Sequence, residues 1–137
     1  MSQYEERILR ILKQNRIYYQ REKTFSTLKE GRLRYDIFIP NYCGKSIIIE
    51  VNGEQHYSIV KKFHKTRAEF LKYQENDRRK ISWGLSNNYM YYCIPFWKIN
   101  QITTLQEIFC VDNQAFDRWK NDNDWRKFCL IKNLKTK

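Results

Sequence analysis

The most strand-like segment of this chain is a β-branched run at residues 46–51, which reads Ser-Ile-Ile-Ile-Glu-Val. Residues 33–40 precede it and alternate with a period of two. The two faces of that segment hold different sets of residues: Leu33, Tyr35, Ile37 and Ile39 on one face, and Arg34, Asp36 and Phe38 on the other. Because turn-forming residues at 40–45 separate the two segments, we expect an antiparallel hairpin.

Each strand of this hairpin carries one acid, Asp36 or Glu50, among apolar neighbours. An ionised group there loses its hydration unless something positive meets it. If the turn is centred at Cys43, the two acids lie directly opposite each other, with Cβ atoms about 4.5–5.5 Å apart. A divalent cation such as Mg²⁺ would convert their repulsion into coordination. A turn centre shifted by half a residue would break this pairing, and an ion pair between Asp36 and Arg34 is the alternative.

One of the two histidines, His56, follows Glu50 by six residues, after the chain-bending Gly53. A neutral imidazole beside a carboxylate pair could take a proton from water that attacks a phosphodiester, because its ordinary pKa is about 6.5. A structural histidine is the alternative. The three residues together, in a basic chain, favour the catalytic interpretation.

The remaining elements follow from hydrophobic periodicity and strand propensity. We expect a helix at residues 4–14, a strand at 17–25, a helix with a broad exposed positive face within 61–80, a strand at 89–94, and one or more basic helices after 103. Tyr91, in the last strand, is assigned to the core. The predicted order is therefore helix-β-β-β-helix-β-helix, an α/β (α+β) fold with a mixed central sheet flanked by helices.

A length of 137 residues allows one domain. We expect a single domain at 1–137, with a core at about 4–100 and a basic, aromatic, helical extension at about 101–137. The N-terminal residues are charged and polar, and no apolar run has the length of a signal peptide or a membrane span. We therefore expect a soluble, cytoplasmic protein with no membrane partner.

Positive charge dominates the composition, because 26 Lys and Arg face 15 Asp and Glu and give a formal charge of +11. Such a field favours polyanions, and nucleic acid before membrane. The candidate nucleic-acid-binding residues lie in and around the basic stretch: Lys61, Lys62, Lys65, Arg67, Arg78 and Arg79. A solvated helix face is the alternative for these cations.

The segments 34–40 and 48–57, which read Arg-Tyr-Asp-Ile-Phe-Ile-Pro and Ile-Ile-Glu-Val-Asn-Gly-Glu-Gln-His-Tyr, carry a resemblance. The chain resembles the nuclease core of the PD-(D/E)XK superfamily, and more closely its Vsr-like and EDxHD branch of phage and homing endonucleases. The similarity runs from about residue 5 to residue 97. It implies a restriction-endonuclease-like core that cuts DNA with Mg²⁺, for which Mn²⁺ can substitute.

The resemblance also implies roles for individual residues. Asp36 would be the principal metal ligand, and Glu50 or the main-chain carbonyl near Val51 would complete the protein's share of the ligands. His56 would be the general base. The helical glutamate of the family would be Glu5, with Glu6 as the alternative.

Three further residues receive lesser roles by the same resemblance. Gln55 would be a hydrogen-bond partner beside the base, and Asp77 would orient groups or balance charge. The lysine of the wider superfamily, two residues after the acidic strand position, is Asn52 here. This departure favours a histidine base, and Lys80 or the Arg78 and Arg79 pair would then neutralise the pentacovalent phosphate.

The sequence therefore predicts a metal-dependent DNA endonuclease from a phage or mobile element. The alternative is a non-catalytic nucleic-acid-binding protein that keeps the nuclease fold. A homodimer would help such an enzyme make double-strand breaks, and the sequence identifies no dimer interface.

Overall fold

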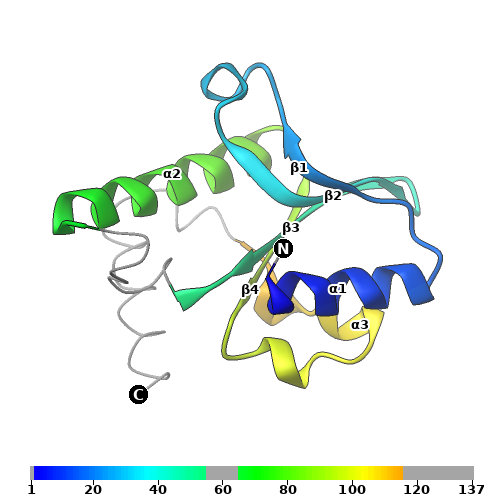
Figure 1. Ribbon diagram of the computed structural model, residues 1–137. Coiled ribbons are helices and arrows are strands. Elements are labelled where there is room, and N and C mark those ends of the chain that lie inside the picture. The colour runs from blue at the N-terminus through cyan, green and yellow to red at the C-terminus, as the bar shows by residue number, and fades with distance from the viewer. Residues whose placement is uncertain (1, 55–64, 116–137) are drawn as a thin grey trace.

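A computed structural model describes residues 2–54 and 65–115 of the chain. Its core is a four-stranded sheet in the order β1-β2-β3-β4, with helices packed against it (Figure 1). The helices and strands are α1 (Gln3–Gln14), β1 (Gln20–Thr24), β2 (Arg34–Tyr42), β3 (Lys45–Asn52), α2 (Arg67–Ser86), β4 (Met90–Pro95) and α3 (Leu105–Ile108). The protein is thus mixed α/β, as the sequence predicts.

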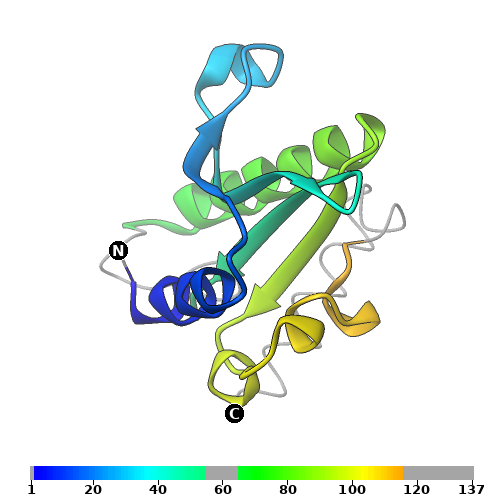
Figure 2. The same cartoon turned by 90° about the vertical axis from the view of Figure 1, so that its right-hand side faces the viewer.

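The sheet is mixed because its strands are joined in two ways. Strands β1, β2 and β3 form an antiparallel meander. Strand β4 runs parallel to β3, which requires the crossover that contains α2. The views in Figures 1 and 2 agree that α1 and α2 cover opposite faces of the sheet. The predicted order from the first helix to the last strand is confirmed.

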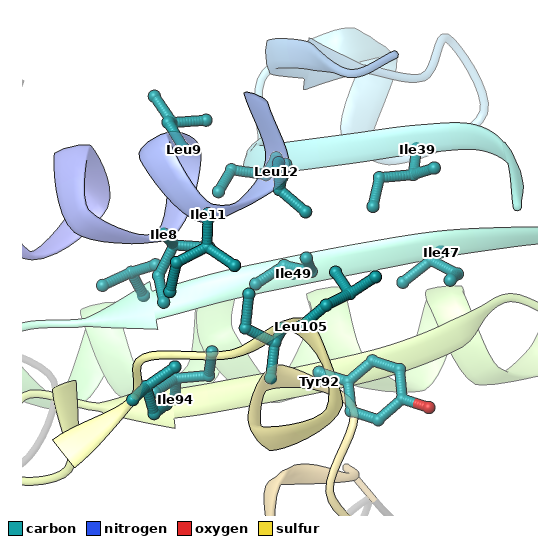
Figure 3. Packing of buried hydrophobic residues seen from close by; sticks show 14 of the residues in the cluster. Ile8, Leu9, Ile11, Leu12, Ile39, Ile47, Ile49, Tyr92, Ile94 and Leu105 are labelled. Carbon is teal, nitrogen blue, oxygen red and sulfur yellow. The ribbon is translucent and has the colours of Figure 1, made fainter. Parts of the chain in front are cut away.

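Helix α1 begins at an N-cap, where the Ser2 hydroxyl accepts a hydrogen bond from the Glu5 amide at 3.1 Å. Apolar residues at helical spacing then turn one face of α1 towards the sheet. They pack on the apolar residues of β2, β3 and β4 and on Leu105 of α3 (Figure 3). This cluster contains Ile8, Leu9, Ile11, Leu12, Ile37, Ile39, Ile47, Ile49, Val51, Tyr92, Ile94 and Leu105.

The β2–β3 turn consists of Cys43 and Gly44, which both have positive φ, at 53° and 83°. Such a two-residue turn matches the twist of the flanking strands. It pairs Tyr42 with Lys45, so the turn centre lies half a residue beyond Cys43. A register shift between Ile39 and Tyr42 compensates for this offset and pairs Ile39 with Ile47. The pairing then continues in this register as far as Ile37 and Ile49, next to Asp36 and Glu50.

On the other face of the sheet, α2 packs against Phe38, Ile48 and Tyr91. The helix begins at its N-cap Thr66 and continues to Ser86, six residues beyond the predicted stretch. Its first turns are exposed, whereas Ile81 and Gly84 are buried against the sheet. The described part of the predicted stretch keeps an exposed basic face with Arg67, Lys72 and Arg79, and the buried Ile81 and Gly84 lie beyond that stretch.

Tyr35 lies on a different face from the predicted one. It is fully buried in the cluster beneath α2, whereas Ile37 belongs to the cluster beneath α1. Between these two residues lies Asp36, which is opposite Glu22 of β1, a residue with a positive φ of 52°, and whose carboxylate accepts from the Val51 amide. The regular alternation is lost there, so the period-two assignment of Tyr35 is wrong.

After β4 the chain forms the short helix α3, which begins with a capping box between Thr104 and Glu107. The chain then returns to the sheet, where Gln114 bridges to Tyr92. The predicted basic helical extension lies mostly outside the described residues. Within the described ranges, no helix is long and apolar enough to cross a membrane.

Candidate active site

Strands β2 and β3 are joined at Asp36 and Glu50 by their side chains. The Asp36 amide donates a hydrogen bond to Glu50 Oε2 at 3.2 Å, and the Val51 amide donates one to Asp36 Oδ2 at 2.8 Å. Counted outward from the β2–β3 turn, the regular Cα pairing of the two strands ends one residue before these acids, at Ile37 and Ile49. Two carboxylates therefore occupy the position where backbone groups would otherwise pair.

Glu50 is deeply buried, with 4% of its surface exposed. Its Oε1 atom accepts a hydrogen bond from the Tyr91 hydroxyl at 3.2 Å and forms an ion pair with Lys80 Nζ. Its Oε2 atom accepts from the Asp36 amide. Three donors, one from each of β2, β4 and α2, thus hold the carboxylate of a β3 residue, and a buried charge is stable only when it is paired in this manner.

Lys80 reaches Glu50 from α2 through a side chain that is only 11% exposed. Its Nζ lies 5.2 Å from the centre of the Tyr35 ring, a distance at which a cation is attracted to the ring face. The Tyr35 hydroxyl donates to the main-chain carbonyl of Lys80 at 2.7 Å and ties this turn of α2 to the sheet. The alternative interpretation of Lys80 as part of a solvated helix face is therefore wrong.

Burial and charge shift the pKa of the groups in this cluster. Burial first, and then the charge of Glu50, raise the pKa of Asp36 well above its usual range, although Lys80 opposes this. Burial acts to lower the pKa of Lys80, but Glu50, Asp77 and Asp36 raise it above its usual value. The acids around Lys80 therefore keep it as an ammonium.

Asp77 lies on α2, one turn before Lys80, at the same small hollow as Glu50. The hollow lies between the sheet and the helix and is lined by Glu50, Asn52, Asp77, Ile81, Tyr91 and Cys93. The charge of Asp77 raises the pKa of Tyr91 and of Lys80. The structure thus brings Asp77 to the Glu50 cluster, and its role in orienting groups or balancing charge stays a prediction.

Glu5 has a different partner. It is buried on α1, and its Oε2 atom forms an ion pair with Arg21 of β1 at 3.2 Å. Neither this pair nor the exposed Glu6 contacts Asp36 in the described part of the chain. The catalytic role of Glu5 stays a prediction.

The predicted nucleic-acid-binding cations divide into two groups. Lys65 and Arg67 are exposed at the start of α2. Arg78 and Arg79, further along the helix, both pair with Glu75, at 3.6 Å and 3.4 Å. The first turns of α2 therefore present more free positive charge than the turn that carries Lys80.

Four predicted residues lie outside the described residues: Gln55, His56, Lys61 and Lys62. The predicted proximity of His56 to the two acids is therefore untested. Among residues 2–54 and 65–115, no group of three or more His, Cys, Asp or Glu side chains is arranged to hold a metal ion.

Sequence reasoning missed the part played by two tyrosines. It assigned Tyr91 and Tyr35 to the core, where they lie, but not to hydrogen bonds with Glu50 and with the Lys80 carbonyl. A signal for Tyr91 was present, because an acid on a buried strand needs donors from the neighbouring strand. No comparable signal exists for Tyr35, whose face depends on the distortion at Asp36.

The fold and the cluster together define a mixed α/β protein with a buried carboxylate–lysine–tyrosine site at the junction of β2, β3 and α2. Comparison of the chain with protein-family models, with curated proteins and with solved structures found no match.

Proposed function

We propose that this protein is a Mg²⁺-dependent DNA endonuclease with a restriction-endonuclease-like core. The observation that carries the proposal is the convergence of Asp36 and Glu50, two acids from adjacent strands, on one buried position. The resemblance to the Vsr-like branch of the PD-(D/E)XK superfamily and the formal charge of +11 agree with this function.

The donor set of the site suits a hard divalent cation. Asp36 and Glu50 offer carboxylate oxygens, and the main-chain carbonyl near Val51 offers a third oxygen, which are the ligand types that Mg²⁺ prefers. Burial first, and then the charge of Glu50, raise the pKa of Asp36 even though Lys80 opposes this, and a divalent cation bound beside Asp36 would favour its ionised form. These residues would hold Mg²⁺ or Mn²⁺, which supplies charge neutralisation to a phosphodiester when bound.

The chain's own residues would then carry the hydrolysis. His56 would accept a proton from the water whose oxygen forms the new bond to phosphorus, while the bond from phosphorus to the leaving oxygen breaks and that oxygen takes up a proton. Gln55 would hydrogen-bond beside the base. Lys80 would add positive charge at the phosphate, and Asp77 would balance the charge of Lys80.

The partner in this proposal is DNA, held through its phosphates. Lys65 and Arg67 are exposed and carry positive charge towards solvent at the start of α2. Contacts of this kind give affinity without sequence readout and weaken as salt rises. Lys61 and Lys62, which lie outside the described residues, are the other cations proposed to contact phosphates.

A plasmid-cleavage assay with Mg²⁺ or Mn²⁺ tests the proposal. Asp36→Asn removes a proposed metal-ligand carboxylate but keeps an oxygen that can accept from the Val51 amide, and we expect it to reduce cutting at least 100-fold. His56→Ala should also reduce cutting at least 100-fold, because a general base contributes about 10²–10⁴-fold. Glu30→Gln is the matched control, because this acid lies 84% exposed in the β1–β2 connection. Equal cutting by wild type, Asp36→Asn and His56→Ala would refute the enzymatic assignment.

A second candidate function is a non-catalytic nucleic-acid-binding protein. The observation that favours it is the full set of partners that Glu50 already has in Lys80, Tyr91 and the Asp36 amide. This candidate predicts salt-sensitive DNA binding with no Mn²⁺ binding. Calorimetric titration with Mn²⁺ therefore separates the two functions.

A further inference from the structure

We propose that Lys80 is a built-in counter-ion that competes with the divalent cation for Glu50. This inference rests on the proposed function, because it concerns the same carboxylates. It assigns Lys80 a positioning role in the metal-free protein: its ammonium holds the acidic cluster together and has to give way, at least in part, when a metal binds.

The first support is the sharing of one carboxylate. Lys80 Nζ and the Tyr91 hydroxyl both contact Glu50 Oε1, which uses the two lone pairs of that oxygen. Glu50 Oε2 already accepts from the Asp36 amide, and the Asp36 side chain is itself hydrogen-bonded to the Glu50 side chain. A cation bound to Glu50 must therefore either displace the ammonium or bind at Oε2 beside it.

The second support is electrostatic. Lys80 and Glu50 are both nearly excluded from water, with side chains 11% and 6% exposed, so solvent screens their surroundings weakly. A divalent cation at Oε2 would lie close to the ammonium and be repelled by it. Both routes, displacement and repulsion, lower the affinity of the site for the metal.

The third support is that a displaced ammonium has other partners within reach. Asp77 lies three residues earlier on the same helix, where side chains are neighbours, and its charge already acts on Lys80. The Tyr35 ring lies 5.2 Å from Nζ. Lys80 can therefore leave Glu50 without becoming an unpaired buried charge, which makes the exchange feasible.

Calorimetric titration of Mn²⁺ into the full-length protein tests this role without any measurement of cleavage. We expect Lys80→Gln, which removes the charge and keeps a hydrogen-bond donor, to lower the Kd for Mn²⁺ about tenfold. Lys72→Gln makes the same change at an exposed position of α2 and should leave the Kd unchanged. Asp36→Asn identifies the heat that belongs to this site, and circular dichroism verifies that each variant is folded.

Thermal unfolding of Lys80→Met gives a second measurement. Without metal this variant should unfold at a lower temperature than wild type, because Glu50 is left as an uncompensated buried charge. Mn²⁺ should then raise its midpoint by more than it raises that of wild type, because the metal replaces the lost charge. A merely structural lysine would give the first effect without the second.

The outcomes distinguish this inference from the proposed function. Equal or weaker Mn²⁺ binding by folded Lys80→Gln, with wild-type binding and cleavage intact, would overturn the counter-ion role and leave the nuclease assignment standing. Absence of Mn²⁺ binding in wild type and in every variant, together with absence of cleavage, would overturn both.

Discussion

Replacement of Gly84 by alanine tests the close packing that positions the candidate site. Gly84 is the point where α2 lies against the sheet, and a Cβ atom there would come within 2.7 Å of Tyr91 Cδ2 and 2.9 Å of Tyr91 Cε2. Non-bonded carbon atoms prefer about 3.5–4.0 Å, so α2 or the Tyr91 ring has to move by about 1 Å. Tyr91 is 2% exposed and has little room to move.

The expected effect is the difference of two terms. Overpacking a close-packed core costs about 1–3 kcal/mol, and alanine gains about 1 kcal/mol over glycine inside a helix. We therefore expect Gly84→Ala to lower the free energy of unfolding by about 1 kcal/mol. Displacement of Tyr91 should also weaken Mn²⁺ binding, because the Tyr91 hydroxyl holds Glu50.

Urea denaturation followed by circular dichroism measures the first effect, and calorimetric titration with Mn²⁺ measures the second. Ser86→Ala, an exposed change in the last turn of α2, is the control and should alter stability by no more than about 0.5 kcal/mol. A Gly84→Ala protein as stable as wild type, or more stable, would show that helix propensity dominates. The close helix–sheet contact would then have no energetic consequence, and the reasoning would be refuted.

Two further predictions concern the buried polar groups. Burial and the charge of Glu50 raise the pKa of Asp36. Between the unfolded and folded pKa values of this group, the folded protein therefore retains a proton that the unfolded chain has released. The stability that this proton contributes to the folded protein is lost as pH rises through the folded pKa. Urea denaturation at pH 5 and pH 8 without metal should therefore show that Asp36→Asn gains stability over wild type as pH rises. Glu30→Gln should show no such trend. If the free energies of unfolding of Asp36→Asn and wild type differed by the same amount at both pH values, this reasoning would be contradicted. Tyr35→Phe removes the hydrogen bond to the Lys80 carbonyl and should cost about 0.5–1.5 kcal/mol in the same measurement at one pH, and an unchanged midpoint would show that this bond does not hold α2.

Helix α1 and the β2–β3 hairpin show which parts of the fold can be predicted from the residue pattern of short segments. The apolar spacing of α1 and the Ser2 cap lie within one short segment, so local rules predict the element and its buried face. The alternation of Ile37 with Ile39, and the run at 46–51, likewise predict a hairpin. The opposition of Asp36 and Glu50 was expected from a turn centred at Cys43, and the actual turn lies half a residue away.

The register was recovered only because a bulge between Ile39 and Tyr42 offsets the turn. Local residue preferences favour a turn at Cys43 and Gly44, but the bulge lies outside this two-residue turn. Agreement with the expected register thus came from two deviations that cancel. The face of the sheet on which Tyr35 lies also depends on neighbouring strands. The alternation is lost at Asp36, which lies opposite Glu22 of β1 and binds the Val51 amide of β3.

The amino-acid sequence by itself determined the elements, their order, and the placement of an acid on each of two adjacent strands, because these follow from periodicity and turn residues within short windows. Only the tertiary structure decided that Lys80 lies inside the molecule and that Tyr91 binds Glu50. The physical reason is that a lysine on a helix has no local signal for burial. Its position depends on a carboxylate thirty residues earlier, which becomes its neighbour only when α2 packs across the sheet.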